Sequence, residues 1–218
     1  MNKNILPKTS LPKRYEIKLD IDLENFSYIG IQTVEMEILE NTKSIFLNSL
    51  GIKISHASLI DKNDEKINLY VEYFQDDERI SLSSKNEILK GEYRLYLEFK
   101  SEITNDLKGF YRSRFLNKED EEKWIATTQF EPTAARNAFP CWDEPEYKAV
   151  FSITLVADKK YLRVSNEKVL SEKELEDNKI ATTFVDSMKM STYLVAFVIG
   201  ELEATEIGNA GNTKVRIV

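Results

Sequence analysis

Gln129 and Glu131 stand two positions apart, where a strand-like stretch gives way to the proline-containing segment 127–145. On a strand, residues two apart point to the same face, so both side chains would lie on one side of the chain. A carboxylate placed there could bind a cationic ligand. The spacing leaves an alternative open, because the Glu131 carboxylate could instead cap a helical turn expected over residues 132–136.

The other residue types that carry chemistry are few. His56 is the single histidine and lies in the strand-like segment 53–59, whereas catalytic zinc sites and Ser-His or Cys-His pairs need histidines in specific places. Cys141 has no histidine nearby. Asp143 and Glu144 could form an acid–base pair or bind a hard cation, but adjacent residues on a strand point apart. We therefore predict no catalytic residue, no metal ligand and no cofactor in this chain.

Composition narrows the class of protein. The chain has 218 residues with 42% hydrophobic residues, which is typical of a packed globular domain. Lys and Arg number 30 against 37 Asp and Glu, without a basic face, so we expect no nucleic-acid partner. The single cysteine and the absence of an apolar leader in the first residues favour the cytoplasm. The longest apolar run, 193–199, is far below the ~20 residues of a membrane span, so no membrane contact is expected.

Alternation of apolar and polar residues predicts strands with one wet face. The alternating stretches are 14–24, 34–38, 67–73, 80–82 and 93–99. Short polar breaks between strands are typical of loops and hairpins. These breaks are 61–65, 117–123, 177–179 and 209–212.

Two further segments complete the expected fold. Residues 193–199 are continuously apolar, which predicts a central strand covered on both faces. Pro132 can occupy the first position of the short helical turn over 132–136. We therefore predict an all-β, mostly antiparallel saddle or sandwich-like domain over residues 1–218 with one helical turn. Its two sub-sheets are expected to divide near Asp106.

Four stretches resemble one known family in both residues and order. The segment TTQFEPTAARNAFPCWDEPEYKAVFSITL, from residue 127, is similar to the zinc aminopeptidases that include aminopeptidase N, puromycin-sensitive aminopeptidase and the tricorn-interacting factors. The other stretches are LPKRYEIKLDIDL (11–23), LKGFYRSRF (107–115) and MSTYLVAFVIGELE (190–203). The resemblance covers nearly all of the chain.

The resemblance implies a saddle-shaped β domain that packs on a thermolysin-like catalytic domain. It implies that Glu131 helps hold the α-ammonium of a peptide and that Gln129 lines the pocket for the first side chain. The family's Gly-x-Met-Glu-Asn and His-Glu-x-x-His motifs are absent, so zinc is expected in a missing catalytic domain and this chain alone is expected to be inactive. Its expected partners are peptides with a free amino terminus and that catalytic domain. The alternative is a non-catalytic β-sandwich module that binds a partner protein.

Overall fold

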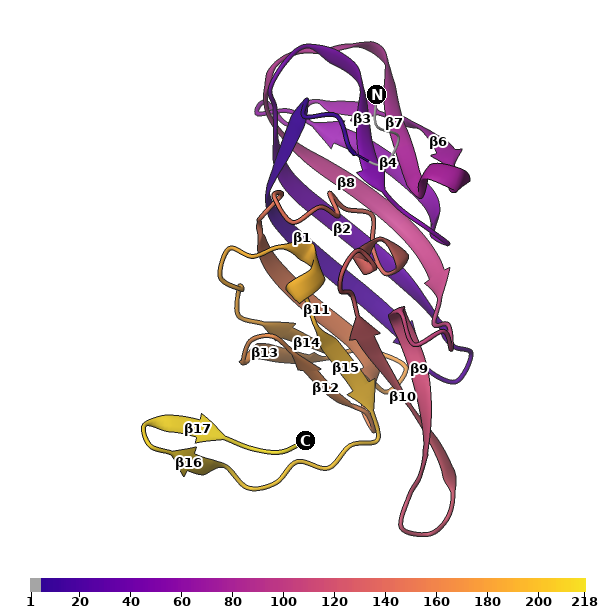
Figure 1. Ribbon diagram of the computed structural model, residues 1–218, viewed down its shortest axis with the longest axis vertical. Helices are drawn as coiled ribbons and strands as arrows, with labels where there is room; N and C mark the ends of the chain where they lie inside the picture. Colours follow the sequence, from indigo (N-terminus) through magenta and orange to yellow (C-terminus); the bar gives the residue numbers. More distant parts are fainter. Residues whose placement is uncertain (1–4) are drawn as a thin grey trace.

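The protein is built almost entirely from β-strands, as the computed structural model of residues 5–218 shows (Figure 1). The strands of these residues are β1 (Ser10–Asp22), β2 (Ser27–Ile38), β3 (Thr42–Asn48), β4 (Lys53–Ile60), β5 (Lys66–Asn68), β6 (Tyr70–Phe74), β7 (Arg79–Ile88), β8 (Gly91–Glu102), β9 (Gly109–Leu116), β10 (Glu122–Gln129), β11 (Val150–Asp158), β12 (Leu162–Ser165), β13 (Val169–Glu174), β14 (Lys179–Phe184), β15 (Phe197–Gly200), β16 (Gly208–Ala210) and β17 (Thr213–Val215). The short 3-10 turns are η1 (Gln75–Asp77), η2 (Ala135–Asn137) and η3 (Thr192–Leu194).

The strands form one large sheet and smaller ones. Within residues 5–218, the large sheet has the order β13-β14-β11-β1-β2-β8-β4-β5, and two smaller sheets have the orders β12-β15-β10-β9 and β3-β7-β6. Strands β16 and β17 pair with each other in a separate hairpin. Nearly all pairings are antiparallel. The predicted all-β, mostly antiparallel class is therefore confirmed.

The alternating pattern of β1 explains its place in the middle of the large sheet. Tyr15, Ile17 and Leu19 are buried on the inner face, whereas Glu16 and Lys18 are exposed on the outer face. Strand β1 pairs with β2, and β2 pairs with β8, along almost their whole lengths. The structure thereby confirms the strands predicted over 14–24, 34–38, 80–82 and 93–99.

A parallel pairing joins the two halves of the chain. Strand β1 pairs in parallel with β11, from Arg14 opposite Val150 to Asp20 opposite Val156. Strands β11, β14 and β13, which follow residue 106 in the sequence, therefore extend the large sheet. The predicted division of the sheets near Asp106 is wrong, because β1 uses both of its edges and bonds to strands from both halves.

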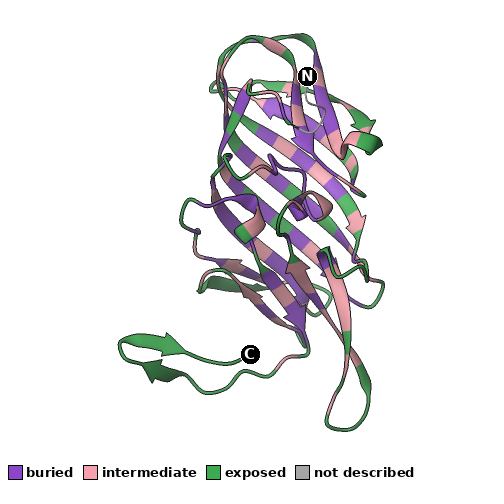
Figure 2. Cartoon of the chain, viewed as in Figure 1, coloured by how far each residue is buried: buried purple, intermediate pink, exposed green. Residues whose placement is uncertain are grey.

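The two smaller sheets cover one face of the large sheet. Figure 1 shows the three-stranded sheet over its upper end and the four-stranded sheet over its lower end. Buried and exposed residues alternate along the strands of the large sheet (Figure 2). Ile45 and Leu82 from the upper sheet and Phe110 and Ile199 from the lower one are buried in the same core as β1. The arrangement is that of a sandwich with a divided second layer.

The apolar run 193–199 does not form one long strand. Thr192–Leu194 is the 3-10 turn η3, and only Phe197–Gly200 is the strand β15. Leu194 is 49% exposed. The run is thus a turn followed by a short strand that lies between β12 and β10, and the prediction of a strand covered on both faces is wrong. Within residues 5–218, no helix is long and apolar enough to cross a membrane.

The predicted strand over 67–73 is also divided. Lys66–Asn68 pairs with β4 in the large sheet, whereas Tyr70–Phe74 pairs with β7 in the three-stranded sheet. Leu69 is buried between them. The alternation of apolar and polar residues continues where the chain passes from one sheet to the other at Leu69, because the apolar residues on both sides of Leu69 face the same core.

Candidate functional site

Gln129 and Glu131 lie at the end of strand β10, on either side of a buried aromatic anchor. Phe130 is 1% exposed and packs edge-on against Phe139 and Phe197, with ring centroids 6.0 and 6.1 Å apart. Gln129 and Glu131 are both exposed. The backbone N–H of Glu131 donates to Oε1 of Gln129 over 3.4 Å. The structure therefore places the Gln129 side chain against the backbone of Glu131, and no hydrogen bond joins the two side chains among residues 5–218.

The start of strand β9 lies beside Gln129 and packs closely against the turn η2. Gly109 lies opposite Gln129 in the β9–β10 pairing. It has a φ of +72°, and a Cβ at this position would lie 2.6 Å from Cβ of Asn137. Glycine is therefore required here, since any side chain would push the 3-10 turn η2 away from the strand.

The Glu131 carboxylate is free of partners in the described part of the chain. No hydrogen bond or ion pair to it is found among residues 5–218, and the turn η2 has no side-chain cap. The predicted helical turn over 132–136 begins later, at Ala135, because the N–H of Ala134 first closes a turn onto the carbonyl of Phe130 over 2.7 Å. The capping role considered for Glu131 is therefore not seen.

A buried ion pair holds the segment that follows. The carboxylate of Asp143 is 1% exposed and accepts from Nε of Arg136 over 3.0 Å and from its backbone N–H over 3.2 Å. The same guanidinium donates to the Asp143 carbonyl over 3.1 Å and to Glu78 over 3.1 Å. The two ends of segment 136–143 are thereby locked together.

Two polar residues from distant parts of the chain, Asn48 at the end of β3 and Thr192 in the turn η3, complete this network. The hydroxyl of Thr192 donates to Oδ1 of Asp143 over 2.7 Å, and the backbone N–H of Asp143 donates to Oδ1 of Asn48 over 3.1 Å. Asn48 and Cys141 also exchange backbone hydrogen bonds of 2.8 and 3.1 Å. The sequence reasoning missed this network. A signal for it was present in the opposite charges of Arg136 and Asp143, which flank an apolar stretch.

Side chains of the large sheet bind the carbonyl groups of the same segment. The Tyr28 hydroxyl donates to the carbonyl of Ala138 over 2.8 Å, and the Gln32 amide donates to that of Pro140 over 2.8 Å. The Tyr15 hydroxyl accepts from the backbone N–H of Trp142 over 3.2 Å, and burial raises the pKa of this phenol well above its usual value. The segment therefore lies firmly across the inner face of the sheet.

The remaining candidates do not gather into a reactive site. Glu144 accepts from the N–H of Leu6 over 2.6 Å, so its carboxylate and that of the buried Asp143 serve separate contacts. Cys141 is buried, and desolvation, followed by the nearby Asp143 charge, raises the pKa of its thiol well above the usual value. His56 stands opposite Glu98 in the β4–β8 pairing.

The zinc ion that the family resemblance implies does not fit the residues of this chain. The chain contains one histidine and one cysteine, and the cysteine is buried. Over residues 5–218, no three His, Cys, Asp or Glu side chains lie close enough together to hold a metal ion. The donor set of an ordinary zinc site is therefore not present here.

Comparisons with known proteins identify the family. Residues 11–194 match the profile of the Peptidase M1 N-terminal domain. Puromycin-sensitive aminopeptidase of Caenorhabditis elegans is 38% identical over 97% of this chain and 23% of its own length. Aminopeptidase M1 of Arabidopsis thaliana is 35% identical over 97% and 24%, and endoplasmic reticulum aminopeptidase 1 of Homo sapiens is 34% identical over 99% and 23%. The chain spans less than a quarter of the length of these relatives. It belongs to the Peptidase M1 N-terminal domain family.

Proposed function

We propose that this chain is the part of an aminopeptidase that holds the free amino terminus of a peptide. In this proposal the Glu131 carboxylate accepts hydrogen bonds from the α-ammonium, and Gln129 lines the space for the first side chain. The observation that supports it is an exposed carboxylate without a partner in residues 5–218, beside the buried ring of Phe130. The names of the relatives, which are aminopeptidases, support the substrate class.

The chemistry of the two groups suits this role. A carboxylate and an ammonium form charge-assisted hydrogen bonds that are roughly twice as strong as neutral ones. The Arg136–Asp143 pair and Phe130 hold the backbone around Glu131, so little backbone entropy is lost when a ligand binds and the main ordering cost is that of the Glu131 side chain. Glu131 would select peptides with an unblocked amino end, and Gln129 would contact the side chain next to it.

The catalytic step belongs, in the same proposal, to polypeptide outside these 218 residues. We propose that residues 1–218 form one domain, which packs on a catalytic domain that binds zinc, and that the isolated chain does not hydrolyse peptides. A cytoplasmic location is proposed from the single cysteine. Relatives named for the endoplasmic reticulum and for mitochondria show that family membership leaves the compartment open.

The test is Glu131→Gln in the aminopeptidase that contains this chain. The substitution keeps the shape of the side chain and removes its charge. A charge-assisted hydrogen bond contributes about 1.5–3 kcal/mol, so kcat/KM for a free-amine peptide should fall by about one to two orders of magnitude. Glu40→Gln is the matched control, because Glu40 is also exposed and has no hydrogen bond or ion pair within residues 5–218.

A second ligand separates binding of the amine from a change in folding. An N-acetylated peptide lacks the ammonium, so its inhibition constant should be the same for wild type and Glu131→Gln. Equal weakening of both ligands, together with a lower melting temperature, would mean that Glu131 only stabilises the local turn. Unchanged kcat/KM for the free-amine peptide would mean that Glu131 does not hold the amine.

A further inference from the structure

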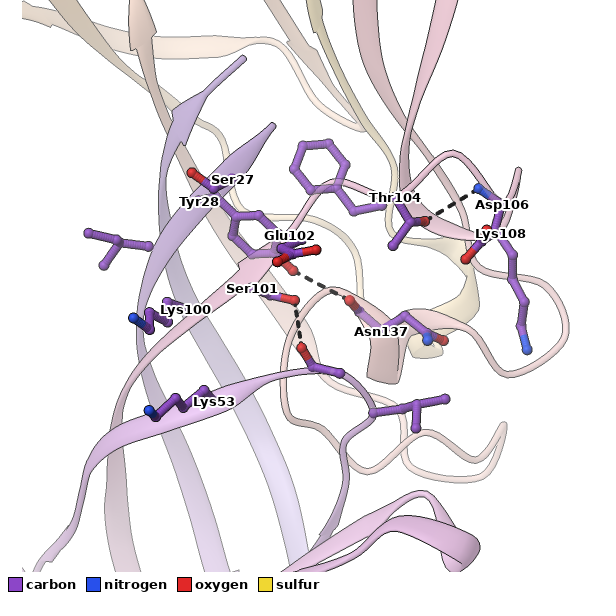
Figure 3. Close-up of a pocket in the computed structure, with 14 residues that line it drawn as sticks. Ser27, Tyr28, Lys53, Lys100, Ser101, Glu102, Thr104, Asp106, Lys108 and Asn137 are labelled. Atoms are coloured by element: carbon purple, nitrogen blue, oxygen red, sulfur yellow. Dashed lines mark hydrogen bonds between the residues drawn. The ribbon is translucent and has the colours of Figure 1, made fainter. Parts of the chain in front are cut away.

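The outer face of the large sheet, which the two smaller sheets leave uncovered, carries two exposed isoleucines. Ile29 and Ile31 lie next to each other on this face of β2, and they are 60% and 38% exposed. Figure 3 shows Lys53 and Lys100 extending to this side of the strands, whereas Tyr28 extends to the inner side. Adjacent exposed apolar side chains on an otherwise polar face are a feature of interaction surfaces.

Charged residues flank the two isoleucines in two rows that cross the strands. In the first row, Ile31 lies between Lys18 of β1 and Glu98 of β8. In the second row, the other isoleucine lies between Asp20 of β1 and Lys100 of β8. Each row therefore has one positive and one negative end, and the order of the signs is reversed between the rows.

This pattern is complementary to a second copy of itself. A two-fold axis parallel to the face, perpendicular to the strands and midway between the two rows, places each row over the other row of the second copy. Lys18 then faces Asp20 of the second copy. Lys100 faces Glu98 of the second copy, and the isoleucines of one copy face those of the other. Because the contact is isologous, every one of these pairs occurs twice.

A second copy would also offset a repulsion that one copy leaves in place. Lys53 of β4 stands directly opposite Lys100 of β8, and neither forms an ion pair within residues 5–218. Like charges directly opposite on neighbouring strands destabilise a sheet. In Glu98, Oε1 accepts from the Tyr96 hydroxyl over 2.7 Å, and Oε2 bonds to no residue of the described part of the chain. This second oxygen is the group that would meet the lysine pair of the other copy.

The size of the face and its outer rows set the expected strength of the contact. Five neighbouring strands, from β11 to β4, form the face, and with about 4.8 Å between strands and about 30 Å of length they offer roughly 700 Å². A standard interface takes roughly 800 Å² from each partner. Glu16 would lie near Asp22 of the second copy, which is a repulsive contact, although packed sheets cross at about 30° and their outer rows diverge. A weak, salt-sensitive dimer is therefore expected.

We propose that this chain forms a two-fold symmetric dimer through the outer face of its large sheet. The two isoleucines lie at the centre of the contact, and the Lys18–Asp20 and Lys100–Glu98 pairs surround them. The inference goes beyond the proposed function and does not depend on it, since Gln129 lies on β10 in a sheet on the opposite face.

Sedimentation equilibrium of the 218-residue chain, from about 10 µM to about 1 mM, tests the proposal. Lys100→Glu turns two attractive contacts of the dimer into repulsive ones and should raise its Kd by roughly ten- to hundredfold. Adding Glu98→Lys to this variant restores opposite charges in both contacts, so the Kd should return to within roughly threefold of wild type. Lys85→Glu is the matched control, because Lys85 is an exposed strand lysine on β7 in the three-stranded sheet.

Three further measurements separate this contact from unfolding and from other modes of association. Lys100→Glu should keep or raise the melting temperature, since it places opposite charges on β4 and β8. Ile29→Thr keeps a β-branched residue on the strand and removes apolar contact, so it should raise the Kd by roughly three- to tenfold. Sodium chloride at about 0.5 M should weaken the dimer, because it screens exposed charges. Association through the exposed apolar residues of the β16–β17 hairpin, such as Ile207 and Val215, would not weaken in this way.

Four results would each overturn the proposal. The first is a chain that stays monomeric at about 1 mM. The second is a dimer that Lys85→Glu weakens as much as Lys100→Glu. The third is a double variant that dimerises as poorly as Lys100→Glu alone. The fourth is a dimer that high salt does not weaken, since that result would assign the contact to the hairpin.

Discussion

The carboxylate of Asp143 should contribute more to stability than any exposed acidic residue of this protein. It is 1% exposed and accepts hydrogen bonds from Arg136 and Thr192. In Asp143→Ala these donors lose their acceptor inside the protein. Removing one partner of a buried ion pair costs about 3–5 kcal/mol.

The surroundings of Arg136 place the expected loss of stability in Asp143→Ala at the lower end of this range. Its side chain is 11% exposed, and it retains a bond of 3.1 Å to Glu78 after Asp143 is removed. We therefore expect Asp143→Ala to lower the free energy of unfolding by about 3 kcal/mol. Asp143→Asn keeps the shape and one acceptor oxygen, so it should cost less, about 1–2 kcal/mol.

Urea denaturation followed by tryptophan fluorescence measures these values, because Trp142 is adjacent to the substitution. With an m-value of about 2–3 kcal/mol per molar urea, Asp143→Ala should lower the midpoint by about 1 M. Asp186→Ala is the control, since Asp186 binds Arg14 at the surface with 46% of its side chain exposed. Such an exposed pair contributes less than about 1 kcal/mol.

Equal effects of Asp143→Ala and Asp186→Ala would refute this reasoning. If Asp143→Ala lowers the free energy of unfolding by less than about 1 kcal/mol, the buried ion pair contributes no more to stability than an exposed one. Thr192→Val offers an independent check. It removes the 2.7 Å donor of Asp143 while keeping the shape of the side chain, and should cost about 1–3 kcal/mol.

A hydrogen bond from Arg14 lowers the pKa of Asp186 in the folded protein. The contribution of Asp186 to the free energy of unfolding is therefore fully present above the unfolded pKa of ~3.9. It is lost as the pH falls through the lower pKa of the folded state. The stability difference between wild type and Asp186→Asn should shrink across that range in urea titrations, and a constant difference would contradict it. Burial raises the pKa of the Cys141 thiol. Iodoacetamide at neutral pH should therefore modify Cys141 in urea but not in the native protein, as measured by mass spectrometry. Fast labelling of the native chain would contradict this prediction.

The strand pattern of this fold could be predicted wherever one strand has one buried face. Tyr15, Ile17 and Leu19 alternate with charged residues, and they form β1 with these side chains inward. Alternation does not tell which sheet a strand joins, so the crossing at Leu69 was missed. It also does not report the parallel pairing of β1 with β11, since that depends on residues more than a hundred positions apart.

The candidate site divides in a similar way between local and distant information. A shared side for Gln129 and Glu131 is a prediction from their spacing, and their proposed role comes from the family resemblance. The hydrogen bonds that hold the segment behind these two residues could be predicted neither from the spacing nor from the resemblance, because they join Asp143 to Asn48 and Thr192, which are far from it in the sequence. The apolar run 193–199 was wrongly predicted as one strand, and the structure instead has the 3-10 turn η3, whose first residue, Thr192, bonds to the distant Asp143.

Under the proposed function, substitutions at Glu131 and at the residues that hold its backbone should affect peptide binding differently. Glu131 itself bonds to no side chain in residues 5–218 other than through its backbone N–H to Gln129. Its position is therefore set by the backbone, which Phe130 fixes on one side and the Arg136–Asp143 pair on the other. Under the proposed function, a change at Asp143 should lower the affinity for the peptide amine as well as stability, whereas a change at Glu131 should lower the affinity alone. Comparing the two variants separates the group that contacts the ligand from the groups that hold it in place.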